Sequence, residues 1–135
     1  MGHVAERLVV ADTDVVIDFL RGSGEALALM RELVKEGRLR LTAVTAFELR
    51  VGTDFLGRGD RISALLARRT LPLDTIGAMR AGETYARLRE QGADVGVKDA
   101  LQAGVCLRFD LPLATRNLRH FERIPGLRLH PVGSS

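Results

Sequence analysis

The chain has few of the residues that stabilise small disulfide-rich domains or stack on nucleic-acid bases. Its single cysteine, Cys106, excludes an internal disulfide, and its apolar helical surroundings predict a packed thiol. Aromatic residues make up only 4% and tryptophan is missing, so a row of base-stacking side chains is not expected. No apolar run approaches the roughly 18 residues of a membrane span, and residues 1–7 contain no apolar segment resembling a signal peptide. These absences favour a cytoplasmic protein outside the membrane.

Lysine is also scarce, and the positive charge is carried almost entirely by arginine. Only Lys35 and Lys98 are lysines, although the net charge is +3 and the pI is near 9.7. Arginine suits bidentate contacts to phosphate. A polyanionic partner is therefore compatible with the composition, which does not by itself demand one.

Short apolar segments alternate with helical patterns along the 135 residues, a length that suits one domain. Strands are predicted near 8–11, 39–41, 71–73, 113–115 and 127–129, and helices near 12–20, 26–36, 45–52, 62–66, 76–89 and 99–109. This alternation predicts an α/β fold, a three-layer α/β/α sandwich with a mostly parallel central sheet. The whole chain, 1–135, is expected to form one domain with its core in about 8–131.

Single carboxylates stand where three of these segments pass from strand to helix. Asp12 follows the first strand, Glu48 comes soon after the second, and Asp99 opens the helix that ends near Phe109. In such folds ligands bind outside the carboxyl ends of the strands, so the three acids are expected at one edge of the sheet. Converging carboxylates repel one another unless a divalent cation lies between them, and oxygen ligands favour Mg²⁺ or Mn²⁺.

Each acid also has an ordinary structural interpretation. Asp12 suits a helix N-cap, and Thr45 with Glu48 has the spacing of a capping box. Asp99 suits the first turn of a helix, where it would complement the helix dipole. Only the joint placement of the acids at strand-to-helix junctions favours a metal site over these interpretations.

Further polar residues surround the predicted site. Asp14 follows Asp12 on the first helical turn and suits either a fourth metal ligand or a hydrogen-bonding neighbour, whereas Asp18 is expected to be a solvated or locally paired surface acid. With His120 as the only nearby histidine, zinc is disfavoured. A hydroxyl, an amide and guanidinium groups after the fourth strand could orient water or grip phosphate, although exposed arginines in a turn are equally ordinary. These groups belong to Thr115, Arg116, Asn117 and Arg119.

With these residues assembled, the chain resembles a PIN-domain ribonuclease, most closely the VapC toxins of bacterial toxin–antitoxin pairs. The resemblance spans about 8–131 and rests on the order and spacing of four segments. Asn117 departs from the family pattern, because many PIN nucleases have a fourth acid there. The four segments are 9–20 with Asp12, 45–49 with Glu48, 96–103 with Asp99, and the closing stretch 115–127.

The resemblance implies metal-assisted hydrolysis of RNA phosphodiester bonds by an endoribonuclease. Asp12, Glu48 and Asp99 would hold Mg²⁺ or Mn²⁺, and Asn117 would complete the catalytic set. The resemblance also implies a VapB-type antitoxin as partner and a homodimer. Groups that would contact the RNA, or hydrogen-bond to the acids or to water, are those of Asp14, Thr115, Arg116 and Arg119.

Two other functions fit parts of the pattern. Asp12 and Asp14 have the spacing of the nucleophile and general acid in haloacid-dehalogenase-type phosphatases. Lys98 would supply the lysine that those enzymes need, but the chain has no downstream pair of adjacent aspartates. The second alternative is a PIN-like domain with a decayed site that binds RNA without cutting it, and Asn117 leaves that alternative open.

Overall fold

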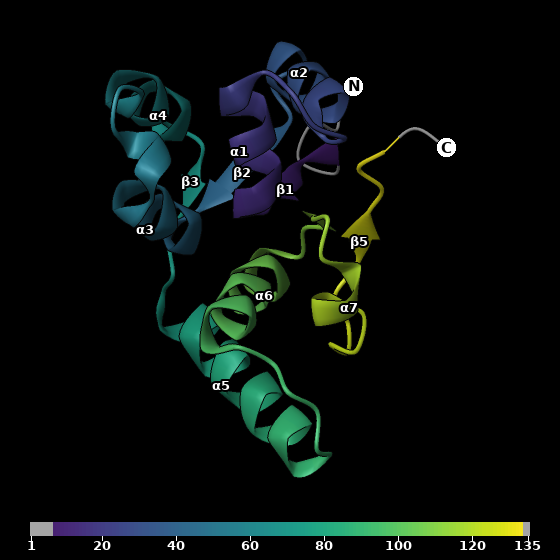
Figure 1. The fold of residues 1–135 in the computed structure, drawn as a ribbon. Helices are drawn as coiled ribbons and strands as arrows, with labels where there is room; N and C mark the ends of the chain where they lie inside the picture. The colour runs from purple at the N-terminus through teal and green to yellow at the C-terminus, as the bar shows by residue number, and fades with distance from the viewer. Residues whose placement is uncertain (1–6, 134–135) are drawn as a thin grey trace.

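A parallel five-stranded sheet forms the centre of the protein, in the strand order β3-β2-β1-β4-β5 (Figure 1). A computed structural model describes residues 7–133; the N-terminal stretch in which we found no signal-like segment lies almost wholly outside the described residues. All four strand pairings are parallel. The strands are β1 (Val9–Ala11), β2 (Leu39–Thr42), β3 (Thr70–Leu71), β4 (Leu113–Ala114) and β5 (Leu129–His130).

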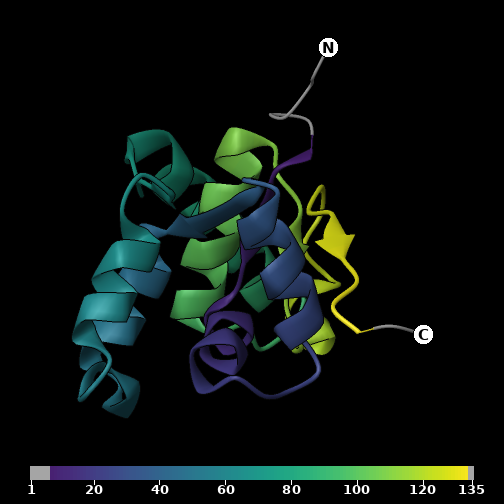
Figure 2. The same ribbon diagram turned by 90° about the horizontal axis from the view of Figure 1, so that it is seen from above.

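Helices cover both faces of this sheet, which confirms the predicted α/β/α sandwich. In Figure 1, α1 and α2 lie above the sheet and α5 and α6 below it, and Figure 2 shows the same layers from above. No helix of the described part of the chain is long and apolar enough to cross a membrane. The helices are α1 (Thr13–Arg21), α2 (Leu27–Lys35), α3 (Ala43–Val51), the 3-10 helix η2 (Thr53–Phe55), α4 (Gly59–Leu66), α5 (Thr75–Glu90), α6 (Val97–Phe109) and α7 (Leu118–Phe121).

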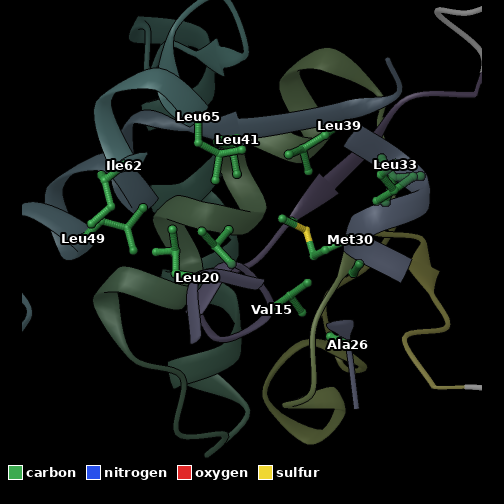
Figure 3. Close-up of a cluster of buried hydrophobic side chains, with 14 residues drawn as sticks. Val15, Leu20, Ala26, Met30, Leu33, Leu39, Leu41, Leu49, Ile62 and Leu65 are labelled. Atoms are coloured by element: carbon green, nitrogen blue, oxygen red, sulfur yellow. The ribbon is translucent and has the colours of Figure 1, made fainter. Parts of the chain in front are cut away.

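Strand β1 is buried on both faces, as expected of the central strand of a parallel sheet. Val9 and Ala11 point toward α1 and α2, whereas Val10 points toward α5 and α6. The first core cluster, on the side of α1 and α2, also takes in side chains of α3 and α4 such as Leu49 and Ile62 (Figure 3). Because β1 is enclosed in this way, the residue that follows it begins α1 with little access to water.

Helix α3 begins three residues earlier than the capping-box interpretation required, so that interpretation is wrong. Thr42 is the N-cap, and its hydroxyl oxygen accepts a hydrogen bond from the Thr45 backbone N–H at 3.1 Å. Thr45 therefore lies inside the first turn. Glu48 lies a turn further on, where its side chain is not used to cap the helix.

Helices α5 and α6 pack so closely that a glycine is required between them. A Cβ atom built on Gly104 would lie 2.5 Å from the Gly77 carbonyl oxygen and 2.7 Å from the Ala81 Cβ. These atoms belong to the backbone and to a side chain too short to move aside. Helix α6 is therefore held in a narrowly defined position against α5.

We predict that Gly104→Ala lowers the free energy of unfolding by about 1–3 kcal/mol, because the added methyl overpacks the contact with α5. The matched control is Gly82→Ala on the exposed face of α5, where a Cβ would have no neighbour within 4 Å. That control should gain up to about 1 kcal/mol from helix propensity. Urea unfolding of both variants checks the prediction, and equal stabilities would contradict it.

Candidate active site

Asp12 lies at the carboxyl end of β1, where it is also the N-cap of α1. Its Oδ1 accepts hydrogen bonds from the Thr13 backbone N–H at 2.9 Å and from Gln102 Nε2 at 3.0 Å. Its Oδ2 accepts one from the Thr115 hydroxyl at 2.7 Å. Asp12 is only 7% exposed, and this burial, more than the repulsion from Asp14, raises its pKa from 3.8 to about 6. A buried acid with a raised pKa at a strand end is typical of a functional site.

Asp14 lies beside Asp12 and has one carboxylate oxygen without a hydrogen bond. Its Oδ2 accepts from the Arg116 backbone N–H at 3.0 Å and from Asn117 Nδ2 at 3.3 Å. Its Oδ1 is buried and has no hydrogen-bond partner within residues 7–133. Burial also raises the pKa of Asp14. An unpaired buried carboxylate oxygen of this kind suits a cation or a water molecule.

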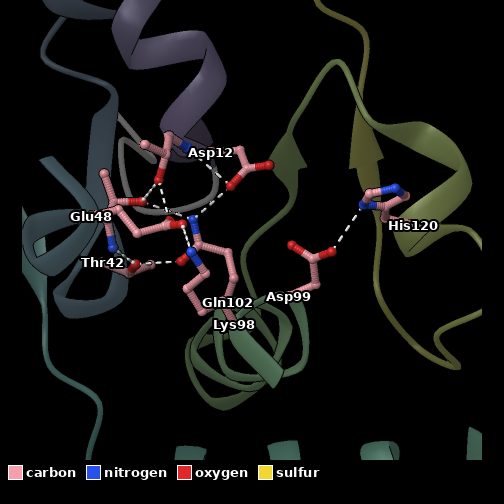
Figure 4. A network of polar contacts seen from close by, with 9 residues as sticks. Asp12, Thr42, Glu48, Lys98, Asp99, Gln102 and His120 are labelled. Carbon is pink, nitrogen blue, oxygen red and sulfur yellow. Dashed lines mark hydrogen bonds and ion pairs between the residues drawn. The ribbon is translucent and has the colours of Figure 1, made fainter. Parts of the chain in front are cut away.

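Glu48 reaches the same region from α3 and is held by two contacts. The Thr13 hydroxyl donates to its Oε1 at 2.6 Å, and Lys98 Nζ lies 3.2 Å from its Oε2 (Figure 4). Thr13 thus lies between the carboxylates of Asp12 and Glu48. The Lys98 ammonium is largely exposed, with 63% of the side chain accessible, so this ion pair faces solvent.

Asp99 lies on the first turn of α6 and pairs with His120, whose Nδ1 is 2.9 Å from its Oδ2. Figure 4 shows the Asp99 carboxylate across from Asp12, on the side of His120. Within residues 7–133, no three carboxylate, histidine or cysteine side chains form a ready-made metal-binding group. The structure thus brings Asp12, Asp14 and Glu48 into one network and holds Asp99 beside it.

The loop after β4 supplies the remaining predicted residues. Thr115 is fully buried, and its hydroxyl oxygen also accepts the Asn117 backbone N–H at 3.0 Å. Arg116 reaches back to α1, with its guanidinium 3.7 Å from carboxylate oxygens of both Asp14 and Asp18. Arg119 is exposed and lines an open groove along this loop and α7.

Asp18, expected to be a solvated or locally paired surface acid, is paired but does not lie on the surface, so the expected exposure is wrong. Asp18 is 7% exposed, and its Oδ2 accepts the Ala26 backbone N–H at 3.1 Å. The chain after α1 turns back over the helix at Gly24, where a Cβ atom would overlap the Asp18 carboxyl group. The Asp18 carboxylate is buried because this turn covers it and excludes water.

Sequence reasoning missed the residues that join the acids, above all Gln102. This side chain is 2% exposed and hydrogen-bonds to both Asp12 and Thr45. One signal was present in the sequence: Gln102 is a polar residue three positions after Asp99, in a stretch of small and apolar residues. Helical spacing puts it on nearly the same face as Asp99.

Comparison with known proteins identifies the class to which this fold and site belong. Residues 9–127 match the PIN domain, so the chain belongs to the PIN domain family. Ribonuclease VapC10 of Mycobacterium tuberculosis is 31% identical over 121 residues, 90% of this chain and 91% of that protein. The tRNA(fMet)-specific endonuclease VapC of Salmonella typhimurium is 30% identical over 87% of this chain and 92% of its own. Within the PIN family the chain is of the VapC type.

Solved structures agree with this assignment. The DNA-bound VapBC of Salmonella typhimurium superposes with a TM-score of 0.76 at 26% identity, over 92% of this chain and 97% of that one. A VapBC-5 structure from Mycobacterium tuberculosis gives a TM-score of 0.66 at 25% identity, over 95% and 99%. The family match favours the nuclease interpretation over the phosphatase one.

The raised pKa of Asp12 predicts a specific dependence of stability on pH when divalent ions are absent. Because the folded pKa of about 6 exceeds the ordinary value of 3.8, the protonated form is favoured on folding. The stabilisation of the folded state by protonated Asp12 is fully present below about pH 4 and is lost as the pH rises through 6. The free energy of unfolding changes by about 2–3 kcal/mol. The variant Asp12→Asn should lack this component.

Unfolding free energies of the wild type and Asp12→Asn, measured in EDTA from pH 4 to pH 7, check this expectation. The wild type should lose stability relative to the variant across this range. Asp94→Asn, which changes an exposed loop acid, serves as the control and should follow the wild type. Parallel curves for the wild type and Asp12→Asn would show that Asp12 titrates normally.

Proposed function

We propose that the chain is a metal-dependent endoribonuclease that acts as the toxin of a VapBC-type toxin–antitoxin pair. The observation that carries this proposal is the buried Asp12 carboxylate at the end of the central strand, beside the unpaired Oδ1 of Asp14. Two buried carboxylates in this position favour the binding of a cation, whereas a carboxylate that only caps a helix requires none.

The donor atoms fit Mg²⁺ or Mn²⁺, which prefer carboxylate oxygens. Asp12 and Asp14 offer such oxygens near the end of β1, and a cation bound there would offset the burial that raises their pKa values. Glu48 and Asp99 would complete the site by exchanging their contacts with Lys98 and His120 for the ion. When bound, a divalent ion polarises the scissile phosphate and activates water.

The surrounding residues would orient the acids and the RNA. Thr115 and Gln102 fix the plane of the Asp12 carboxylate, and Asn117 fixes one oxygen of Asp14. Asn117 would thus take part in catalysis as an amide, where many PIN nucleases have an acid. The exposed cations Lys98 and Arg119 are suited to contacts with the phosphates that flank the cut.

The names of the relatives support the substrate and partner in this proposal. A ribonuclease and a tRNA(fMet)-specific endonuclease act on RNA, and the two solved structures described above belong to VapBC systems. We therefore propose RNA as substrate, a VapB-type antitoxin as partner, and the cytoplasm as location. A homodimer is proposed as well, supported by the exposed apolar side chains of Phe47, Val51 and Met79. An RNA-binding module with a decayed site is the alternative, favoured only by Asn117.

Purified chain should cut RNA from a total-RNA pool in Mg²⁺ or Mn²⁺, and EDTA should stop the cutting. Asp12→Asn should reduce the rate by about 100-fold or more, the scale on which one electrostatic contact to the transition state acts. Circular dichroism of the variant should show an intact fold, since asparagine keeps the size of the side chain.

The matched control is Asp94→Asn, which makes the same chemical change in an exposed loop and should cut like the wild type. Cutting that persists in EDTA, or in Asp12→Asn, would contradict the assigned metal site. RNA that is bound but intact in every metal would favour the decayed module.

The toxin role makes a separate prediction in cells. Expression of the chain alone should arrest bacterial growth, and Asp12→Asn should relieve the arrest because the RNA is then spared. A small antitoxin encoded beside the chain should restore growth and co-purify with it. Normal growth with high levels of the active chain would argue against a toxin.

A further inference from the structure

Gln102 is a buried amide that reaches from α6 to the ends of two neighbouring strands. It is 2% exposed, and its neighbours along α6 include the buried apolar residues Ala103 and Cys106. A buried amide is costly unless its oxygen and both hydrogens are paired. Its partners therefore identify its orientation and its role.

The orientation of the amide is fixed by Asp12 and Thr42 together, because the ionised Asp12 carboxylate can only accept and so faces the Gln102 nitrogen. The Thr42 hydroxyl oxygen accepts the Thr45 backbone N–H, and its hydrogen is donated to Gln102 Oε1 in a short hydrogen bond. The Gln102 nitrogen must then face the other way. Its two hydrogens are donated to Asp12 Oδ1 at 3.0 Å and to Thr45 Oγ1 at 2.9 Å.

This orientation also settles the direction of the next hydrogen bonds. Thr45 Oγ1 accepts from Gln102, so the Thr45 hydroxyl hydrogen is free to be donated to Thr13 Oγ1, 3.0 Å away. The Thr13 hydroxyl hydrogen is donated in turn to Glu48 Oε1 at 2.6 Å. A single directed relay therefore runs from Gln102 through Thr45 and Thr13 to Glu48.

We infer that Gln102 is a positioning residue that sets the orientation of two acids of the site at once, Asp12 directly and Glu48 through the hydroxyls of Thr45 and Thr13. This inference rests on the proposed nuclease function. It adds a specific claim, namely that the two N–H groups of one buried amide align the carboxylate that follows β1 and the carboxylate on α3.

Two substitutions at Gln102 separate the effect of its hydrogen-bond donation from the effect of its side-chain size. Gln102→Glu keeps the shape but brings an acceptor against Asp12, and it would force the Thr45 hydroxyl to turn away from Thr13. Gln102→Met keeps the length of the side chain and removes every hydrogen bond. The matched control is Gln91→Glu, the same change at an exposed residue after α5.

A second pair of variants tests the relay without touching Gln102. Thr45→Val keeps the shape of the side chain and removes the hydroxyl, which breaks the path to Glu48 and leaves the bond from Gln102 to Asp12. Thr45→Ser keeps the hydroxyl and should restore most of the activity that Thr45→Val loses. This pair remains informative if the Gln102 variants fold poorly.

The experiment measures kcat and KM for RNA cleavage at saturating Mn²⁺, together with the rise in Tm that Mn²⁺ produces in the absence of RNA. Both Gln102 variants should lose about 10- to 100-fold in kcat, the range seen when groups that orient metal ligands are removed, with KM within twofold of the wild type. The Mn²⁺-induced rise in Tm should shrink in both. Gln91→Glu should match the wild type in every measurement.

The outcomes distinguish this inference from the function on which it rests. A wild type that cuts no RNA in any metal would overturn the proposed function, and the inference with it. An active wild type whose Gln102 variants keep kcat and the Mn²⁺ response, with only a lower basal Tm, would overturn the inference alone. Equal kcat values for Thr45→Val and Thr45→Ser would overturn the relay to Glu48.

Discussion

The burial of the Asp12 carboxylate at the end of β1 is the constraint around which the polar interior is arranged. A carboxylate with so little access to water needs several donors, and the structure supplies them from Thr13, Thr115 and Gln102. These donors come from α1, the end of β4 and α6, so the site depends on correct packing of all three layers. Even so, the pKa of Asp12 stays raised, because these hydrogen bonds do not fully offset the cost of burying its negative charge. A bound cation would offset the remainder.

Helix α6 links the stability of the fold to the chemistry of the site. It carries Lys98, Asp99 and Gln102 toward the sheet edge, and its close contact with α5 at Gly104 fixes where these side chains lie. The outer acids each face a base, since Glu48 pairs with Lys98 and Asp99 with His120. The contacts of Asp12, by contrast, come only from neutral donors, so a divalent ion would have most to offset at this buried carboxylate.

The elements of the fold could largely be predicted from local patterns, because strand and helix periodicities are visible within a few residues. The strands and the longer helices lie within a few residues of their predicted bounds, and the parallel pairing agrees with the predicted strand–helix alternation. The strand order came only from the tertiary structure. The errors have local causes. Thr42 rather than Thr45 caps α3, and a turn at Gly24 buries Asp18. The short helix α7 carries too few residues for a periodicity to be seen.

The sequence by itself determined the class of fold, the position of Asp12, Glu48 and Asp99 near strand-to-helix junctions, and the resemblance to PIN nucleases, which the family match confirmed. Only the tertiary structure decided which groups these acids contact. Gln102 and Asp12 are 90 residues apart in the chain, and Asp99 and His120 are 21 apart. Such pairings depend on how whole elements pack, and no periodicity of the sequence encodes them. Burial, and with it the raised pKa of Asp12, is a property of the packed layers rather than of any segment.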